Sequence, residues 1–121
     1  RDFRYLIKQR GAMLAKGRLL GIQFETLMED DRYFTIAKEA VEQAMRIRTA
    51  LKEKQIPLLV DSPTNQLFPI LTDEQLEALE EQFDFSIWER VDEQHTAIRL
   101  CTSWATRKEH VDQLIAAVKK L

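Results

Sequence analysis

The apolar stripe between residues 32 and 54 is the feature that most constrains the fold of this chain. Its apolar residues recur at steps of three and four positions, at Phe34, Ala37, Val41, Ala44, Ile47 and Leu51. This spacing places them on one face of a helix, and such a face is stable only when another element covers it. Pro57 ends the segment, because proline cannot continue a helix. We therefore expect one long helix from Arg32 to about Lys54, packed on a core.

The preceding segment, from Phe3 to Met28, has the same helical spacing but contains every glycine of the protein. These glycines are Gly11, Gly17 and Gly21. Each costs up to about 1 kcal/mol relative to alanine in a helix interior, so their clustering favours close packing or a bound group. The acidic turn Glu29–Asp31 follows, and it can cap the long helix.

Short strand-like and helical segments alternate after the long helix. The strand-like segments are 56–60, 66–71, 85–91 and 96–102, the last two joined as a hairpin by Asp92–His95. Capping boxes open the helices, at Thr72–Gln75 for a helix to about Gln82 and at Thr106–Glu109 for the last helix. Strands and helices must each bury an apolar side, so we expect an α+β fold with a small antiparallel sheet and helices on one face.

The composition is that of one compact domain and excludes several classes of partner. The chain has 121 residues, with 18 Lys+Arg against 20 Asp+Glu and a formal net charge of −2, so no basic footprint predicts binding to nucleic acid or an anionic membrane. No apolar run reaches the roughly 20 residues that span a bilayer. A single cysteine allows no internal disulfide, so the cytoplasm is the default location. The first residue is Arg1, in an already helix-like segment, and we expect polypeptide to precede it.

Motifs of an independent active site are absent from the sequence. One cysteine and two histidines, His95 and His110, are too few and too separated for a zinc cluster. There is no phosphate-binding glycine loop, nucleophile elbow or H-E-x-x-H motif. The acidic residues Glu77, Glu80 and Glu81 are typical of a solvated helix face rather than of paired acid/base catalysis. Both histidines are expected at the surface.

Arg99 is the first candidate for chemistry, because it interrupts the apolar strand 97–101. The two-residue period of a strand places Arg99 on the same side as Ala97 and Cys101, whose small side chains leave room around it. The planar guanidinium fork suits bidentate binding of a carboxylate, so Arg99 is a candidate anion anchor. An exposed sheet face, or a salt bridge to Glu89 across the hairpin, explains the pattern slightly better on this evidence alone.

A basic group in the glycine-containing segment is the second candidate. It comprises Lys8, Arg10, Lys16 and Arg18. On a helix these positions span almost three turns, so the four charges cannot all face one ligand, although one or two could meet a phosphate. Composition alone favours a solvated helix face or a subunit interface.

The chain also resembles a known family in three segments. These are KQRGAMLAKGRLLGIQF (8–24), DSPTNQLFPIL (61–71) and HTAIRLCTSWAT (95–106). They are similar to the C-terminal part of the threonine aldolase/β-eliminating lyase family, pyridoxal 5′-phosphate enzymes of fold type I, the aspartate-aminotransferase-like fold. The resemblance implies a connecting helix segment (1–30) and a small C-terminal α+β domain (31–121). It also implies a large cofactor domain upstream that carries the cofactor-binding lysine, without which this chain should be inactive.

The resemblance assigns roles to both candidates. Arg99 matches the family's strand arginine, which binds the substrate α-carboxylate, although the residues that follow it depart from the usual motif. In the basic group, Leu14 stands where the family has an arginine that reaches the cofactor phosphate of a neighbouring subunit. Lys16, Arg18 and Arg10 are therefore the candidates for that phosphate contact.

The function that the resemblance implies is a low-specificity L-threonine aldolase, which cleaves threonine to glycine and acetaldehyde. Two alternatives stay open: an amino-acid β-eliminating lyase on the same scaffold, and a free-standing α+β interaction domain. The partners expected for the enzyme are an amino-acid substrate, its own large domain and further copies of itself in a dimer or tetramer. Neither a nucleic acid nor a membrane is expected, and no residue of this chain is predicted to be catalytic or to bind a metal.

Overall fold

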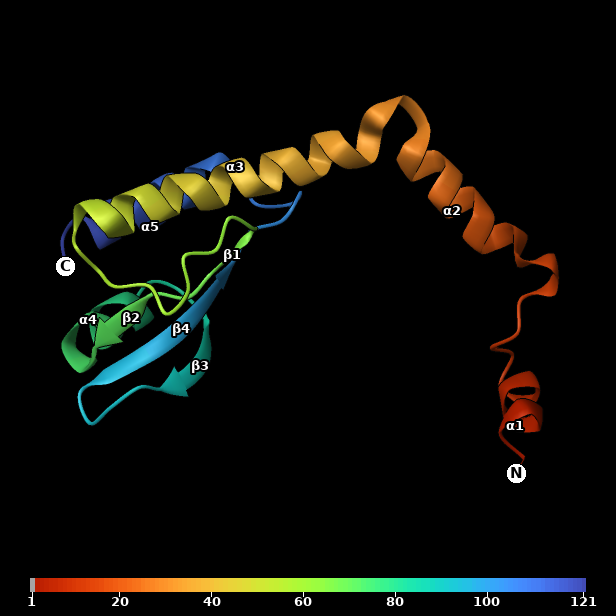
Figure 1. Cartoon of the computed structure of the whole chain (residues 1–121), viewed down its shortest axis with the longest axis horizontal. Coiled ribbons are helices and arrows are strands. Elements are labelled where there is room, and N and C mark those ends of the chain that lie inside the picture. The colour runs from red at the N-terminus through yellow and green to blue at the C-terminus, as the bar shows by residue number, and fades with distance from the viewer. Residues whose placement is uncertain (1) are drawn as a thin grey trace. The chain divides into compact units, whose positions relative to one another are not determined.

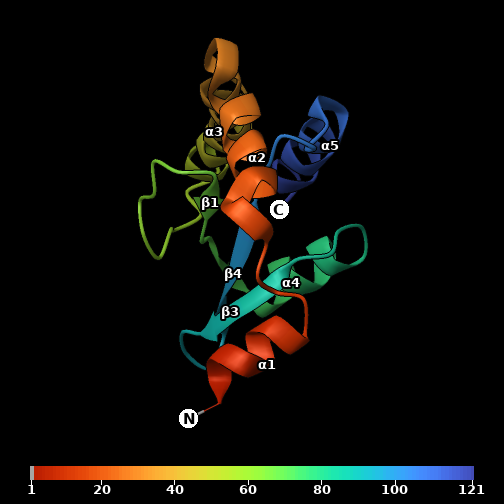
Figure 2. The ribbon, with the colours of Figure 1, turned by 90° about the vertical axis from the view of Figure 1, so that its right-hand side faces the viewer.

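The computed structural model describes residues 2–121 in two compact units, Arg1–Thr35 and Ile36–Leu121. The ribbon is shown in two views in Figures 1 and 2. No helix within residues 2–121 is long and apolar enough to cross a membrane. The expected division into a connecting segment (1–30) and a small domain (31–121) stays a prediction.

The first unit contains helices where the sequence predicts them, but not one continuous helix. Its elements are α1 (Phe3–Gln9), the 3₁₀ turn η1 (Ala15–Gly17), α2 (Arg18–Met28) and the 3₁₀ turn η2 (Glu29–Asp31). Helix α1 ends because Gly11 has a φ of +69°. The Gly11 N–H donates to the Lys8 carbonyl and the Ala12 N–H to the Ile7 carbonyl, each at 3.0 Å. This pattern is a Schellman motif, in which a left-handed glycine closes a helix.

The glycines do not mark a tightly packed contact within the described chain. Gly17 has a φ of +65° and precedes α2, so it too serves a turn. Gly21 lies inside α2, and a Cβ built on any of the three glycines would meet no atom within 4 Å. The expectation of close packing is therefore wrong for the part of the chain described, and nothing in the structure explains Gly21.

Helix α3 (Arg32–Glu53) confirms the long helix predicted from the apolar stripe. Its buried side chains are Ala40, Gln43, Ala44, Ile47, Ala50 and Leu51. The predicted stripe began earlier, at Phe34, which is exposed. Only the part of the helix within the second unit therefore contributes to a core.

The sheet of the second unit is built around one central strand. β4 (His95–Cys101) pairs antiparallel with β3 (Ser86–Arg90) on one edge. On its other edge it pairs with β1 (Gln66–Leu67) and β2 (Ile70–Thr72), also antiparallel. The register runs unbroken from Gln66 opposite Cys101 to Thr72 opposite His95. The predicted strand 66–71 is thus interrupted at Pro69, which has no N–H to donate but still accepts a bond from the Ile98 N–H at 3.0 Å.

The helices of the second unit cover one face of the sheet, as expected. Figure 2 shows α3 and α5 (Lys108–Val118) next to each other, and in Figure 1 the sheet lies beneath them with α4 (Asp73–Glu80) next to β2. One core joins these elements, and its residues are Ala44, Ile47, Ala50, Leu51, Ile56, Leu67, Leu71, Leu79, Ile98, Val111, Ala117 and Val118. The predicted α+β class, with a small antiparallel sheet, is confirmed.

The two predicted capping boxes have different outcomes. At α4 the box is complete, because Thr72 accepts from the Gln75 backbone N–H and the Gln75 side chain accepts from the Thr72 N–H. At α5 it is wrong, because the helix begins one residue later, after Arg107, with no side-chain cap. The hydroxyl of Thr106 instead accepts a bond from the Ser103 N–H at 2.8 Å.

The segment 56–60 does not form the predicted strand. One isolated bridge joins Leu58 to Pro69. The Leu59 N–H donates to the Phe68 carbonyl at 2.8 Å. The Ile70 N–H donates to the Pro57 carbonyl at 2.9 Å, so the segment meets the sheet through this one bridge alone. Asp61, which follows, binds Arg48 and Lys52 of α3.

Candidate functional site

Arg99 lies on the central strand of the sheet, as its sequence pattern predicts. Strand β4 alternates between two faces, and Ile98 is fully buried in the core beneath the helices. Arg99 therefore projects from the opposite face, next to the aromatic side chain of Trp88 on β3. The Arg99 Cζ atom lies 5.8 Å from the centre of the Trp88 ring. Such a distance is within the range of a cation–π contact.

A second aromatic ring supports this contact. Phe68, in the short connection between β1 and β2, meets Trp88 edge-on, with ring centroids 4.9 Å apart and planes at 65°. Two rings from opposite edges of β4 thus form one aromatic pair on the outer face of the sheet. We call Phe68 and Trp88 the aromatic shelf.

The salt bridge considered between Arg99 and Glu89 is absent from residues 2–121. The register of β3 shifts between Ile87 and Glu89, so that Glu89 lies opposite Ala97 and Ser86 lies opposite Arg99. Within the described chain, no carboxylate and no other side chain forms a hydrogen bond or ion pair with the Arg99 guanidinium. Its donors are thus available to a ligand.

Other arginines of the second unit are bound by aspartates. Arg48 Nε donates to Asp61 at 2.7 Å, and Arg90 Nη2 donates to Asp73 at 2.9 Å. These hydrogen bonds are the main cause of the lowered pKa of Asp61 and Asp73, because they favour the ionised carboxylate. The hydrogen bond with Asp73 also raises the pKa of Arg90. Arg99 differs from both arginines in having an aromatic neighbour in place of an acidic one.

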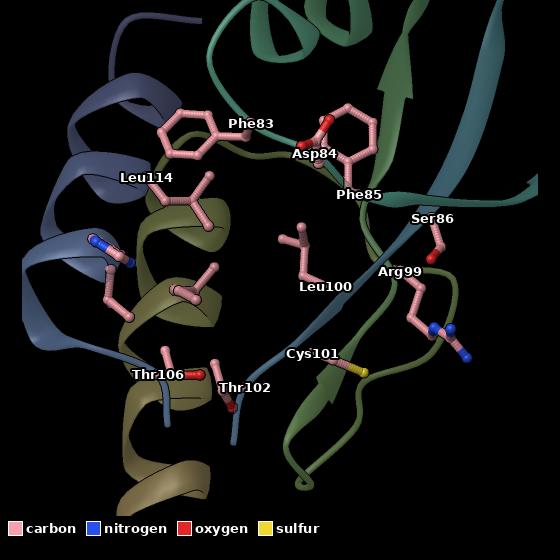
Figure 3. Close-up of a pocket in the computed structure, with 13 residues that line it drawn as sticks. Phe83, Asp84, Phe85, Ser86, Arg99, Leu100, Cys101, Thr102, Thr106 and Leu114 are labelled. Atoms are coloured by element: carbon pink, nitrogen blue, oxygen red, sulfur yellow. The ribbon is translucent and has the colours of Figure 1, made fainter. Parts of the chain in front are cut away.

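A pocket of about 430 Å³ lies on the helix-covered side of β4. Figure 3 shows Leu100, Leu114 and Phe83 around it, whereas the side chains of Arg99 and Cys101 point to the other side of the strand. Arg99 belongs to the wall of this pocket, but its guanidinium does not point into it. The pocket is therefore separate from the free donors of Arg99.

The remaining candidates from the sequence are exposed. Arg10 caps the end of α1, Lys16 lies in η1 with a φ of +59°, and Arg18 begins α2. No ion pair in the described chain engages these three side chains. They belong to the unit Arg1–Thr35, whereas Arg99 belongs to Ile36–Leu121. Their role toward a phosphate stays a prediction.

The histidines lie where a surface role is expected. His95 begins β4 with Nδ1 2.8 Å from an Asp92 carboxylate oxygen, and its side chain is 39% exposed. The pKa of Asp92 is lowered by the backbone N–H of Gln94 first and by His95 second. His110 is exposed and lines the pocket, which sequence reasoning did not predict. No group of three potential metal ligands occurs in residues 2–121.

Comparison with solved structures shows which known proteins this chain is similar to. The threonine aldolase of Leishmania major is 40% identical and matches 97% of this chain, with a TM-score of 0.85. Over nearly its whole length this chain is similar to part of a threonine aldolase. It spans 34% of the length of that relative. No protein-family profile and no curated protein sequence matches it.

A second solved structure extends the likeness of the fold. The serine palmitoyltransferase of Sphingomonas wittichii is 16% identical, with a TM-score of 0.55 over 69% of this chain and 24% of its own. At that identity the likeness concerns the fold alone. The threonine aldolase relative and this match together identify the fold as that of the small C-terminal domain of pyridoxal-phosphate enzymes of fold type I.

Proposed function

We propose that this chain is the C-terminal part of a pyridoxal-phosphate-dependent lyase, a low-specificity L-threonine aldolase that cleaves threonine to glycine and acetaldehyde. The observation that carries the proposal is the guanidinium of Arg99, which no carboxylate in residues 2–121 binds, on the central strand of a fold shared with a threonine aldolase. A positively charged planar fork with free donors is suited to the α-carboxylate that every amino-acid substrate presents.

The part of this chain in the reaction is to bind and orient the substrate. Arg99 would hold the α-carboxylate through two parallel N–H···O bonds, which fixes the rotation of the amino acid and so the direction of its Cα–Cβ bond. When bound, pyridoxal phosphate supplies the electron sink that allows this bond to break. The lysine that holds the cofactor is expected on the large domain, so this chain contributes no catalytic residue.

The first unit offers cations that suit the cofactor's phosphate. Arg10, Lys16 and Arg18 are exposed, and none is paired with a carboxylate in residues 2–121. Charged N–H donors are the usual partners of phosphate oxygens. We propose that one or two of them contact the cofactor of a neighbouring subunit in a dimer or tetramer. A cytoplasmic location fits the single cysteine, which is exposed and free.

The phosphate contacts are tested by measuring the dissociation constant of pyridoxal phosphate. The enzyme that contains this chain is compared with its Arg10→Ala, Lys16→Ala and Arg18→Ala variants. At least one variant should bind the cofactor about tenfold or more weakly, because a charged hydrogen bond contributes about 1.5–3 kcal/mol. Lys8→Ala, in the same basic group, is the matched control and should bind normally. Normal affinity in all three variants would exclude these residues from the cofactor site.

The carboxylate role is tested with Arg99→Leu in the same enzyme. We expect the KM for threonine to rise roughly 10- to 150-fold, because the loss of a charged hydrogen bond costs about 1.5–3 kcal/mol. Arg46→Leu is the control, since Arg46 lies on α3 and binds Asp112 of α5. Unchanged KM and kcat in Arg99→Leu would remove Arg99 from the site.

The reaction itself is tested by supplying the enzyme with L-threonine, L-allo-threonine, tryptophan and tyrosine. Acetaldehyde from a threonine isomer supports the aldolase. If neither isomer gives acetaldehyde while tryptophan or tyrosine loses its Cβ substituent, the protein is a β-eliminating lyase on the same scaffold. If no amino acid is turned over and pyridoxal phosphate does not bind, the interaction-domain alternative stands instead.

A further inference from the structure

Trp88 occupies an irregular position in the sheet. The pairing of β3 with β4 shifts register between Ile87 and Glu89, so Trp88 is the extra residue of a β-bulge. A bulge turns the side chain of its extra residue away from the regular alternation of the strand. Here it places the indole ring under the guanidinium of Arg99, 5.8 Å from the ring centre.

The contact with Trp88 gives Arg99 an aromatic neighbour and no carboxylate. An aromatic ring has no oxygen acceptor, so a cation–π contact does not occupy the N–H donors of a guanidinium as an ion pair does. An aspartate partner, such as those of Arg48 and Arg90, would instead occupy those donors.

The aromatic shelf joins two segments of the sheet. Phe68 meets Trp88 edge-on at 4.9 Å, and the main chain at Phe68 accepts a bond from the Leu59 N–H at 2.8 Å. Trp88 is 50% exposed, so its burial in the core is not what retains it. The ring forms a platform on the open face of the sheet rather than part of the packing beneath the helices.

We propose that Trp88 is a positioning residue that holds the Arg99 guanidinium in the orientation in which it binds the substrate carboxylate. This inference rests on the proposed function, since it concerns the same carboxylate. An arginine side chain loses rotational freedom when it binds a ligand, and a platform that restricts the side chain beforehand reduces that loss. Trp88 therefore acts through Arg99 and does not touch the substrate.

The test compares Trp88→Leu with Trp88→Phe in the enzyme that contains this chain. In Trp88→Leu we expect the KM for L-threonine to rise roughly two- to fivefold with kcat nearly unchanged, the size expected of a cation–π contact at an exposed site. Trp88→Phe keeps an aromatic face and should recover most of the affinity. Trp104→Leu is the matched control, because Trp104 is 73% exposed and lies outside the sheet.

Two further measurements separate positioning from a general effect on folding. With threonine methyl ester, whose carboxyl group carries no charge, Trp88→Leu should behave like the unchanged enzyme. In the Arg99→Leu background, adding Trp88→Leu should cause no further rise in KM, because residues that act as one unit are not additive. A rise with the ester as large as that with threonine would show that Trp88 is merely structural.

The outcomes distinguish this inference from the proposed function. If Arg99→Leu leaves the kinetics with threonine unchanged, the carboxylate role of Arg99 fails and the inference fails with it. If Arg99→Leu raises KM but Trp88→Leu does not, Arg99 keeps its role and the positioning by Trp88 is overturned. A fully additive double variant overturns it as well.

Discussion

The two units of the chain use the same kind of helix but bury it to very different degrees. In Ile36–Leu121, α3 contributes Ala44 and Ile47 to a core that also contains the central strand. In Arg1–Thr35, no side chain of α1 or α2 is buried among the described residues, and Phe24 is 65% exposed. Helical periodicity therefore predicts an apolar face in both units, but it does not say what covers that face.

This contrast has an energetic consequence. Isolated helices shorter than about 12–15 residues are marginal in water, because most helical stability in proteins comes from packing an apolar face. Helix α1 has 7 residues and α2 has 11, and within the described chain neither has a buried side chain. We expect the stability of the chain to reside in the second unit.

The largest difference between the two units is expected when one core side chain and one exposed side chain are each replaced by alanine. Ile98 is fully buried on the central strand, and Ile98→Ala should lower the free energy of unfolding by about 2–5 kcal/mol. Phe24→Ala, on α2, should change it by less than about 0.5 kcal/mol. Urea unfolding followed by tryptophan fluorescence measures the second unit selectively, because Trp88 and Trp104 both belong to it.

A large effect of Phe24→Ala would break the comparison. If that effect also depended on protein concentration, the face of α2 would be covered by another copy of the chain. An effect independent of concentration would mean that α2 stabilises the second unit directly.

Local sequence signals predicted the second unit well. The stripe of α3, the hairpin of β3 and β4, and the capping box at Thr72 each depend on residues a few positions apart, and each is confirmed. One failure, at α5, arises because two N–H groups compete for the same hydroxyl. The Thr106 hydroxyl closes a turn with Ser103 instead of capping α5, and a sequence pattern cannot say which N–H it will serve.

The candidate site could be predicted only in part. Alternation along residues 97–101 placed Arg99 opposite the buried Ile98, which the structure confirms. A salt bridge to Glu89 is one of the alternatives that the sequence leaves open, and the structure has none within residues 2–121. The bulge brings Trp88 to Arg99 instead, and neither composition nor alternation reveals where one extra residue enters a strand.

The second prediction concerns a buried hydroxyl that joins the end of the sheet to α3. Thr102 Oγ1 donates to the Ala40 carbonyl at 2.7 Å and is 4% exposed as a residue. Thr102→Val should destabilise the second unit by about 0.5–1.5 kcal/mol, because it removes a buried hydrogen bond that the Ala40 carbonyl accepts in addition to its helical bond. Thr49→Val is the control, since its hydroxyl makes a similar bond to the Met45 carbonyl on an exposed part of α3. Equal losses in both variants, measured by urea unfolding, would contradict a special role for burial.

The third prediction compares the ends of two helices, one in each unit. Thr72→Ala removes the cap of α4 and should cost about 1 kcal/mol in the unfolding of the second unit. Gly11→Ala should disfavour the left-handed turn after α1 by roughly 1–2 kcal/mol. Tryptophan fluorescence should register the first change and not the second, whereas helicity by circular dichroism should fall in both. A fluorescence shift in Gly11→Ala would show that the end of α1 affects the second unit.

The smallest effect is expected from acid, through the link between Asp61 and α3. The pKa of Asp61 is lowered mainly by the hydrogen bond from Arg48 and then by that from Lys52, so its folded-state pKa lies below the unfolded value of about 3.9. The ionised Asp61 therefore contributes its full stabilisation of the folded state above pH about 3.9, and this stabilisation is lost as the pH falls through the folded-state pKa. Because Asp61 is largely exposed, solvent screens its ion pairs with Arg48 and Lys52, and the loss of unfolding free energy should be modest. Asp61→Asn should reduce the difference between the urea midpoints at pH 7 and pH 3, and an unchanged difference would show that the loop does not depend on this carboxylate.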